Sequence, residues 1–186
     1  MLHRVFIAVN LPESVKTELL SYQEKWKDIP CKWTVKENLH IALMFLGNTS
    51  DKELQKISKI LHEVAARHSP FSVELSHIVY GPSAKDPRMV WVIGEELKEL
   101  LMLQKDLSDA LRRDSVPTLG TESLRFTLHL TLARLNELEF RRIDPAERPD
   151  VEEEISVSFP VRSIEIMESK LKPKGAEYSI VESITL

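Results

Sequence analysis

Hydrophobic and polar residues alternate along several short stretches of the chain, and a period of two is typical of half-buried β-strands. Turn-forming residues such as Gly47, Pro70 and Gly81 separate these stretches. Two of the stretches, 32–35 and 39–46, are close in sequence, and we expect them to form a hairpin or to lie side by side. The predicted strands are 5–11, 32–35, 39–46, 71–79, 89–93, 126–133, 155–159, 161–167 and 176–186, with a turn at 172–175.

Three other segments repeat apolar residues every three or four positions, which predicts amphipathic helices. The first begins at Pro12 and ends before Pro30, because proline is favoured in the first turn of a helix and disfavoured in its interior. The second begins with a capping box formed by Ser50 and Glu53, and the third covers 95–113. Their apolar positions are Val15, Leu19, Tyr22 and Trp26; Leu54, Ile57, Leu61 and Val64; and Leu97, Leu100, Leu101, Leu107 and Leu111.

The order of these elements predicts an α+β fold. A chain of 186 residues can bury a substantial core but is short for two independent domains. We therefore expect residues 1–186 to form one domain of two lobes, each a β-sheet with helices on one face.

Two of the predicted strands nearly copy each other: residues 39–43 read LHIAL and residues 128–132 read LHLTL. Strict alternation places His40, Ala42 and Met44 on one face of the first strand. Phe45 then projects to the opposite face, and we expect it to be a core residue rather than a platform for a nucleobase. In the second strand, the residues predicted to share a face are Thr127, His129, Thr131 and Ala133.

A pair of histidines in matching strands indicates acid and base catalysis, because imidazole gives or takes a proton near neutral pH. An in-line displacement at phosphorus needs such groups on opposite sides of the reacting atom. Thr131, two residues after His129, is placed to donate a hydrogen bond to a phosphate oxygen, and Arg134 to offset its charge. One histidine in a strand is more often structural, which is how we interpret His3, His62, His68 and His77.

Metal chemistry is a weaker interpretation of the same histidines, because no third ligand lies at a recognisable spacing from them. Cys31 is the only cysteine, so no internal disulfide can form within the chain. We interpret its thiol as structural, and we expect neither a metal nor a cofactor.

The formal net charge of −4 argues against a protein that coats nucleic acid, but it allows one small anionic site. Acidic residues crowd the segment 137–154, which is expected to be a solvated loop. The apolar runs are far shorter than the roughly 18 residues of a membrane span, and the first residues lack the pattern of a signal peptide. We expect a cytoplasmic protein with no membrane partner.

At the two histidine motifs the chain resembles the 2H phosphoesterase superfamily, named for a pair of His-x-Thr/Ser-x motifs. Within that superfamily it is similar to the RNA 2′,3′-cyclic phosphodiesterases, LigT-like proteins once called 2′-5′ RNA ligases. The similarity runs nearly end to end, through residues 4–12, 37–40, 45–47, 87–91, 129–134, 167–171 and 175–178.

The resemblance implies a bilobal α+β fold with pseudo-twofold symmetry, in which two antiparallel-rich sheets carry helices on their outer faces and a cleft lies between the lobes. It implies hydrolysis of an RNA-terminal 2′,3′-cyclic phosphate to a 2′-phosphomonoester. One histidine would activate water as the base, and the other would protonate the departing 3′-oxygen as the acid. The sequence does not set the orientation of the substrate, so both assignments are open; we favour His129 as the base and His40 as the acid. The expected partners are RNA 3′ ends or oligonucleotides that bear the cyclic phosphate, and the expected state is a monomer.

Two positions depart from the family pattern. Ala42 stands where the family has threonine or serine, and Leu128 replaces the proline usually found before the second histidine. Loss of one hydrogen bond to a charged group predicts a reaction weakened by about ten- to a hundredfold at most. Two alternatives remain open: a 2′-5′ RNA ligase or another 2′-5′ or cyclic phosphodiesterase acting at the same site, and a non-catalytic module that binds RNA ends.

Overall fold

The computed structural model describes residues 1–118, 126–173 and 175–186. In these residues the strands form one antiparallel sheet in the order β7-β4-β5-β6-β3-β1-β8-β9, with β2 paired to β6. The fold is therefore α+β, as predicted. The strands are β1 (Leu2–Asn10), β2 (Cys31–Trp33), β3 (His40–Ser50), β4 (Phe71–Gly81), β5 (Met89–Gly94), β6 (His129–Leu135), β7 (Glu153–Val161), β8 (Ser163–Lys172) and β9 (Gly175–Thr185).

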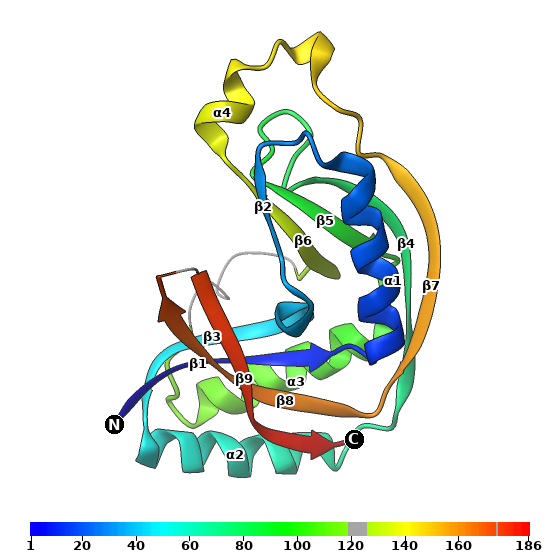
Figure 1. Cartoon of the computed structure of the whole chain (residues 1–186). Coiled ribbons are helices and arrows are strands. Elements are labelled where there is room, and N and C mark those ends of the chain that lie inside the picture. Colours follow the sequence, from blue (N-terminus) through cyan, green and yellow to red (C-terminus); the bar gives the residue numbers. More distant parts are fainter. Residues whose placement is uncertain (119–125, 174) are drawn as a thin grey trace.

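The sheet consists of two halves that meet at a narrow junction (Figure 1). One half is β7-β4-β5-β6 and the other is β3-β1-β8-β9. Between the adjoining strands β3 and β6, the described ladder holds a single residue pair, Ile41 with Leu130. The two histidine strands therefore lie side by side at the centre of the molecule, one from each half.

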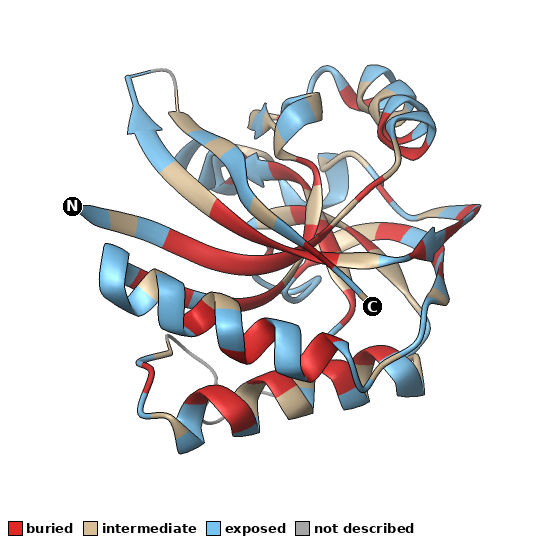
Figure 2. Ribbon diagram, turned by 90° about the horizontal axis from the view of Figure 1, so that it is seen from below, coloured by how far each residue is buried: buried red, intermediate tan, exposed pale blue. Residues whose placement is uncertain are grey.

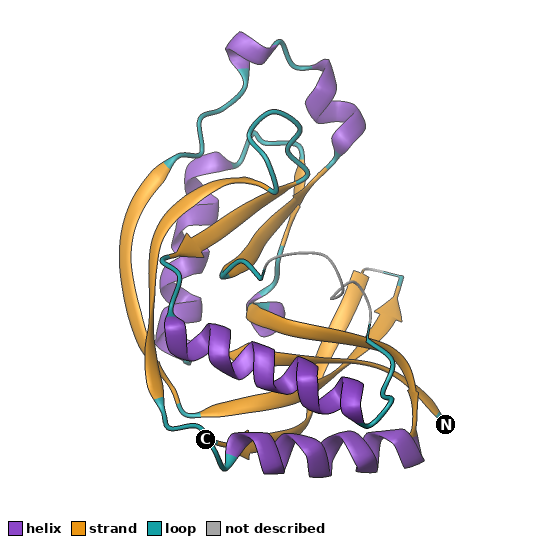
Figure 3. Cartoon of the chain, turned by 180° about the vertical axis from the view of Figure 1, so that it is seen from behind, coloured by secondary structure: helices purple, strands orange, loops and turns teal. Residues whose placement is uncertain are grey.

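Helices cover the outer faces of both halves. The helix α2 (Asp51–Ala65) begins at the predicted capping box of Ser50 and Glu53, and it packs beside α3 (Lys98–Arg113). Figures 1 and 3 show this pair against the half that contains β1 and β3, and Figure 2 shows its buried residues on the inner side. The helix α1 (Glu13–Gln23), continued by the 3₁₀ turn η1 (Glu24–Trp26), runs alongside β4 and β7 in Figures 1 and 3.

The predicted hairpin between residues 32–35 and 39–46 is wrong. The strand β2 pairs with β6 instead, and the 3₁₀ turn η2 (Lys36–Asn38) leads from β2 into β3. A strand has two edges, and β5 occupies one edge of β6, so β2 and β3 share the other edge end to end. Proximity in sequence suggested a local pairing, but the partner lies far along the chain.

The acidic segment 137–154 was predicted to be a solvated loop, but part of it is helical. It contains the short helix α4 (Glu137–Arg142), capped by the Asn136 side chain, and the 3₁₀ turn η3 (Pro145–Glu147). Two long-range hydrogen bonds attach it to the fold: Trp26 Nε1 donates to the Asp150 carbonyl at 3.0 Å, and the Tyr80 hydroxyl donates to the Pro149 carbonyl at 2.8 Å.

Several element ends also differ from the predicted bounds. The third helix begins at Lys98 rather than at residue 95, and the second histidine strand begins at His129 rather than at residue 126. The predicted turn at 172–175 includes residue 174, which lies outside the described residues. Among the described helices, none has the length and apolar character needed to cross a membrane.

Candidate active site

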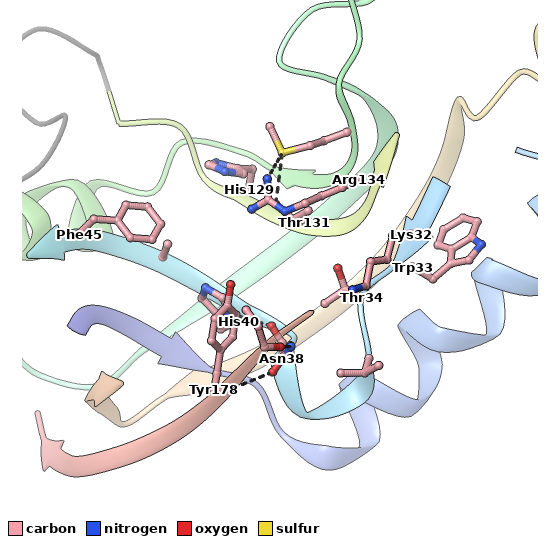
Figure 4. Close-up of a pocket in the computed structure, with 14 residues that line it drawn as sticks. Lys32, Trp33, Thr34, Asn38, His40, Phe45, His129, Thr131, Arg134 and Tyr178 are labelled. Carbon is pink, nitrogen blue, oxygen red and sulfur yellow. Dashed lines mark hydrogen bonds between the residues drawn. The ribbon is translucent and has the colours of Figure 1, made fainter. Parts of the chain in front are cut away.

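A pocket of about 350 Å³ lies where the two halves meet (Figure 4). This volume falls in the range of small-ligand sites, about 300–1,000 Å³. All five residues proposed from the sequence line it: His40 and Ala42 from β3, and His129, Thr131 and Arg134 from β6. The other lining residues are Lys32, Trp33, Thr34, Val35, Asn38, Phe45, Met89, Ala176 and Tyr178.

The two histidine strands have the same order of buried and accessible positions over their first seven residues. In each strand the ladder skips the third residue after the histidine: Leu43 between β3 and β1, and Leu132 between β6 and β5. Such β-bulges shift the alternation of side chains by one position. The pocket-facing residue after Ala42 is therefore Phe45, and the corresponding residue after Thr131 is Arg134.

These bulges correct three sequence predictions. Met44 was expected beside His40, but it is 1% exposed and belongs to the core. Ala133 was expected beside Thr131 and is fully buried. Phe45 was expected in the core, but it lines the pocket and is 51% exposed. Strict alternation fails because each bulge adds one residue to its strand.

Both catalytic candidates are held by the same contact. His40 Nδ1 lies 2.8 Å from the Asn38 carbonyl, and His129 Nδ1 lies 2.9 Å from the Thr127 carbonyl. A carbonyl oxygen only accepts, so Nδ1 must carry the proton and donate. In the neutral ring, Nε2 then holds the lone pair that can receive a proton. The matching geometry gives the two rings the same tautomer.

Both imidazoles favour the neutral form in the absence of substrate. Burial lowers the pKa of His40 to about 4, with further lowering by the positive charges of His129, Arg134 and Lys16. Burial also lowers the pKa of His129. An anion held between the rings would favour their charged forms and raise both pKa values.

The wall formed by β5 and β6 presents hydrogen-bond donors. Arg134 Nη1 and Thr131 Oγ1 lie 3.7 and 3.8 Å from Met89 Sδ (Figure 4). Trp91 Nε1 lies 3.4 Å from the same sulfur. A thioether sulfur is a weak acceptor, whereas phosphate oxygens are strong ones. Trp91 also packs on His129, with ring centroids 4.1 Å apart. Donors suited to an anion are thus gathered beside His129.

The opposite wall is aromatic. The ring of Phe6 lies 4.9 Å from His40 and 5.8 Å from Phe45, and Tyr178 lies edge-on to His40 at 5.2 Å. Figure 4 shows His40, Phe45 and Tyr178 facing the wall of His129 and Arg134. The Arg134 guanidinium and the Thr131 hydroxyl therefore lie on one wall, and the rings of Phe45 and Tyr178 lie on the other.

Asn38 connects β9 to the segment that precedes His40. Its Nδ2 donates to the Ala176 carbonyl at 2.7 Å, and its Oδ1 accepts from the Tyr178 backbone N–H at 3.1 Å. Its own carbonyl is the acceptor for His40. Sequence reasoning assigned no role to Asn38, Met89 or Tyr178; their positions within the segments 37–40, 87–91 and 175–178, which resemble the family, were the available signal.

Comparisons with known proteins agree with this geometry. The model of the family "LigT like Phosphoesterase" matches residues 9–91. The RNA 2′,3′-cyclic phosphodiesterase of Thermus thermophilus is 33% identical, over 98% of this chain and 90% of its own. The protein of the same name from Methanocaldococcus jannaschii is 28% identical, over 96% of this chain and 98% of its own.

Solved structures agree as well. The crystal structure of a Thermus thermophilus protein superposes with a TM-score of 0.84 at 29% identity, covering 98% of this chain and 97% of that one. E. coli LigT complexed with 3′-AMP has a TM-score of 0.80 at 19% identity, covering 100% and 99%, and so supports the fold alone. The chain therefore belongs to the LigT-like phosphoesterases of the 2H superfamily, within the family of RNA 2′,3′-cyclic phosphodiesterases.

Proposed function

We propose that this protein hydrolyses the 2′,3′-cyclic phosphate at RNA 3′ ends to a 2′-phosphomonoester, as a monomer whose single domain has two lobes. The observation that carries the proposal is the pair of imidazoles on opposite walls of one pocket, each fixed by the same Nδ1–carbonyl contact. The names of its relatives support the same reaction.

In the proposed reaction, His129 Nε2 takes a proton from a water molecule, and the water oxygen attacks phosphorus opposite the 3′-oxygen. The bond between phosphorus and the 3′-oxygen breaks, and His40 Nε2–H donates its proton to that oxygen. Thr131 and Arg134 donate to the non-bridging oxygens of the phosphate. The products are a 2′-phosphomonoester and a free 3′-hydroxyl; afterwards His129 releases a proton and His40 regains one from solvent.

The two walls support this assignment of base and acid. Donors for phosphate lie beside His129, so the nucleoside and its 3′-oxygen lie towards His40. The low pKa of His40 in the free protein favours the reverse assignment, since it disfavours the protonated ring. For His40 to act as the acid, the substrate anion must raise this pKa on binding.

Turnover of a nucleoside 2′,3′-cyclic phosphate in the presence of EDTA tests the proposed function. We expect His40→Ala and His129→Ala each to lower kcat by about 10²- to 10⁴-fold, the usual contribution of one general acid or base. His77→Ala changes an exposed imidazole on β4 and serves as the matched control. Full activity in either pocket variant would remove that histidine from the mechanism. Binding without hydrolysis by the unchanged protein would favour the non-catalytic module.

A 3′-thio analogue of the cyclic phosphate distinguishes acid from base. A thiolate leaves without protonation because thiols have a pKa of about 8.5. If His40 is the acid, His40→Ala recovers most of its activity on the thio analogue, whereas His129→Ala does not. Recovery by His129→Ala instead would establish the reverse assignment.

A further inference from the structure

Met89 places a thioether inside the pocket, next to the side chains that the proposed function assigns to phosphate. It is the first residue of β5, and in the strand ladder it pairs with Arg134 of β6. Its Sδ lies 3.4 Å from Trp91 Nε1, 3.7 Å from Arg134 Nη1 and 3.8 Å from Thr131 Oγ1. One sulfur atom therefore has three hydrogen-bond donors around it.

The exposure of Met89 differs from that of the core methionines. Met44 and Met167 are 1% and 2% exposed and pack in hydrophobic clusters. Met89 is only half-buried, and it lines the pocket of about 350 Å³. A molecule as small as hydrogen peroxide can therefore reach its sulfur from solvent.

The surroundings of this sulfur suit an oxidised methionine better than a thioether. A thioether is a weak acceptor and leaves the three donors poorly satisfied. Oxidation converts the side chain into a polar sulfoxide. The added oxygen would accept hydrogen bonds from Thr131 and Arg134, the donors that the proposed function gives to the non-bridging oxygens of phosphate. The sulfoxide oxygen thus takes the place of a phosphate oxygen.

We propose that Met89 is a modification site at which a peroxide oxidises the thioether to the sulfoxide, and that the sulfoxide weakens the binding of phosphate in the pocket. This inference rests on the proposed function, which supplies the phosphate that is displaced. It adds a redox control to the site.

The oxidation step balances with hydrogen peroxide as the oxidant. A lone pair of Met89 Sδ attacks one peroxide oxygen, so that a sulfur–oxygen bond forms and the oxygen–oxygen bond breaks. The sulfur loses two electrons and the peroxide gains them. The proton of the transferred hydroxyl passes through solvent to the departing hydroxide, which leaves as water.

Treatment with hydrogen peroxide, followed by peptide mass spectrometry and steady-state kinetics on a 2′,3′-cyclic nucleotide, tests the proposal. We expect Met89 to gain one oxygen atom and kcat/KM to fall by about ten- to a hundredfold, the effect of one lost hydrogen bond to a charged group. A thiol reductant is added before the assay, because it reverses the first oxidation products of Cys31 and leaves a methionine sulfoxide intact.

Met89→Leu keeps an apolar side chain of similar size and has no sulfur to oxidise. Its kcat/KM should be the same before and after treatment. Met102→Leu is the control, because it removes an exposed methionine of α3 outside the pocket. This control should lose activity on treatment as the unchanged protein does.

Three results would overturn the proposal. The first is an equal fractional loss of kcat/KM in the unchanged protein and in Met89→Leu. The second is a Met89 that stays unmodified while Met102 is oxidised. The third is an oxidised Met89 with unchanged kcat/KM, which refutes this inference and leaves the proposed function intact.

Binding separates this inference from the proposed function. If the unchanged protein hydrolyses no cyclic nucleotide, the proposed function fails, and calorimetry with adenosine 2′-phosphate before and after treatment decides the inference. Weaker binding after treatment in the unchanged protein, but not in Met89→Leu, supports the modification site. Equal binding before and after treatment, or no binding in either state, refutes it.

Discussion

The methyl group of Ala42 faces the pocket two residues after His40, at the position that corresponds to Thr131 on the other wall. Its partner across the ladder is Ala8, which is fully buried. A threonine at position 42 would place a hydroxyl beside the proposed phosphate site. A hydrogen bond to a charged group is worth about 1.5–3 kcal/mol.

We therefore expect Ala42→Thr to preserve kcat/KM on a 2′,3′-cyclic nucleotide or to raise it by up to about a hundredfold. Ala42→Val has the same shape without the hydroxyl and is the matched control, which should gain nothing. A severe loss in Ala42→Thr with normal activity in Ala42→Val would show that position 42 does not face phosphate.

The two low imidazole pKa values also predict the pH dependence of kcat/KM, which reports groups of the free enzyme. The reaction needs one neutral and one protonated ring. The singly protonated pair is most abundant between the pKa of His40, about 4, and that of His129, which is lowered from 6.5. Most of this pair carries the proton on His129; the catalytic form, with the proton on His40, is a constant minor fraction of the pair and therefore follows the same pH dependence. The rate should rise as pH increases through the lower value and fall as pH increases through the higher one.

Steady-state kinetics across this range should thus give a bell with its maximum on the acidic side of 6.5, the ordinary value for histidine. The maximum of kcat should lie at higher pH, because the bound anion raises both pKa values. A maximum of kcat/KM in alkaline solution would contradict the role of burial.

For individual residues, the alternation of apolar and polar positions was enough to predict that His40, Ala42, His129 and Thr131 face one pocket. It failed at Phe45 because a bulge is a property of a strand and its partner. The extra residues become visible only in the pairing of β3 with β1 and of β6 with β5.

Among the elements, the 3₁₀ turn η2 is hydrogen-bonded to the first residues of β9, a strand whose ladder is with β8. The amide of Asn38 makes two hydrogen bonds to the β9 backbone, at Ala176 and Tyr178. Asn38→Ala removes both and keeps the backbone carbonyl that orients His40. We expect KM for a cyclic nucleotide to rise several-fold with little change in kcat, and Tm to fall by about 4–8 °C for two hydrogen bonds of about 1 kcal/mol each.

Thermal unfolding and steady-state kinetics of the same samples check this expectation. Asn136→Ala removes a comparable side-chain contact, the cap of α4, and should lower Tm without changing KM. A loss of kcat as large as the change in KM would place Asn38 in the chemistry rather than in positioning.

Helices and most strands could be predicted because apolar periodicity belongs to each element by itself. The helix α4 was missed because, of its six residues, Phe140 alone is buried, which leaves almost no periodic signal. The partner of β2 was missed because pairing with β6 is a tertiary contact, which no local pattern records.

For the molecule as a whole, His3 ties the beginning of the chain to two distant elements. Its Nδ1 lies 2.7 Å from a Glu168 carboxylate oxygen on β8, and its Nε2 lies 3.0 Å from an Asp51 oxygen on α2. The hydrogen bonds to Glu168 and Asp51 raise the pKa of His3. Hydrogen bonding to His3 lowers the pKa of Glu168, and the N-terminal ammonium and His3 lower that of Asp51.

A raised pKa means that His3 stabilises the fold fully below its ordinary value of 6.5 and less as pH rises through the folded value. The carboxylates contribute above their ordinary values of 3.8 and 4.5. His3→Gln should therefore lower the urea midpoint most between 4.5 and 6.5 and least in alkaline solution. His77→Gln is the control, and a pH-independent difference would contradict this linkage.

The similarity of the two histidine strands predicted that their side chains meet, and residues of both strands line one pocket. Their junction through Ile41 and Leu130 could not be predicted, because one strand's pattern does not show how many pairs it forms with another.

The equivalence of Phe45 and Arg134 gives the pocket a direction. If the two walls had identical side chains, an RNA 3′ end could bind in two opposite orientations, and one of them would be unproductive. Here the repeat duplicates the histidine and its Nδ1–carbonyl contact, but not the pocket-facing side chain five residues later. In the reverse orientation, the phosphate of a nucleotide would lie against the ring of Phe45 instead of the guanidinium of Arg134. Under the proposed function, the enzyme therefore binds its substrate in a single orientation.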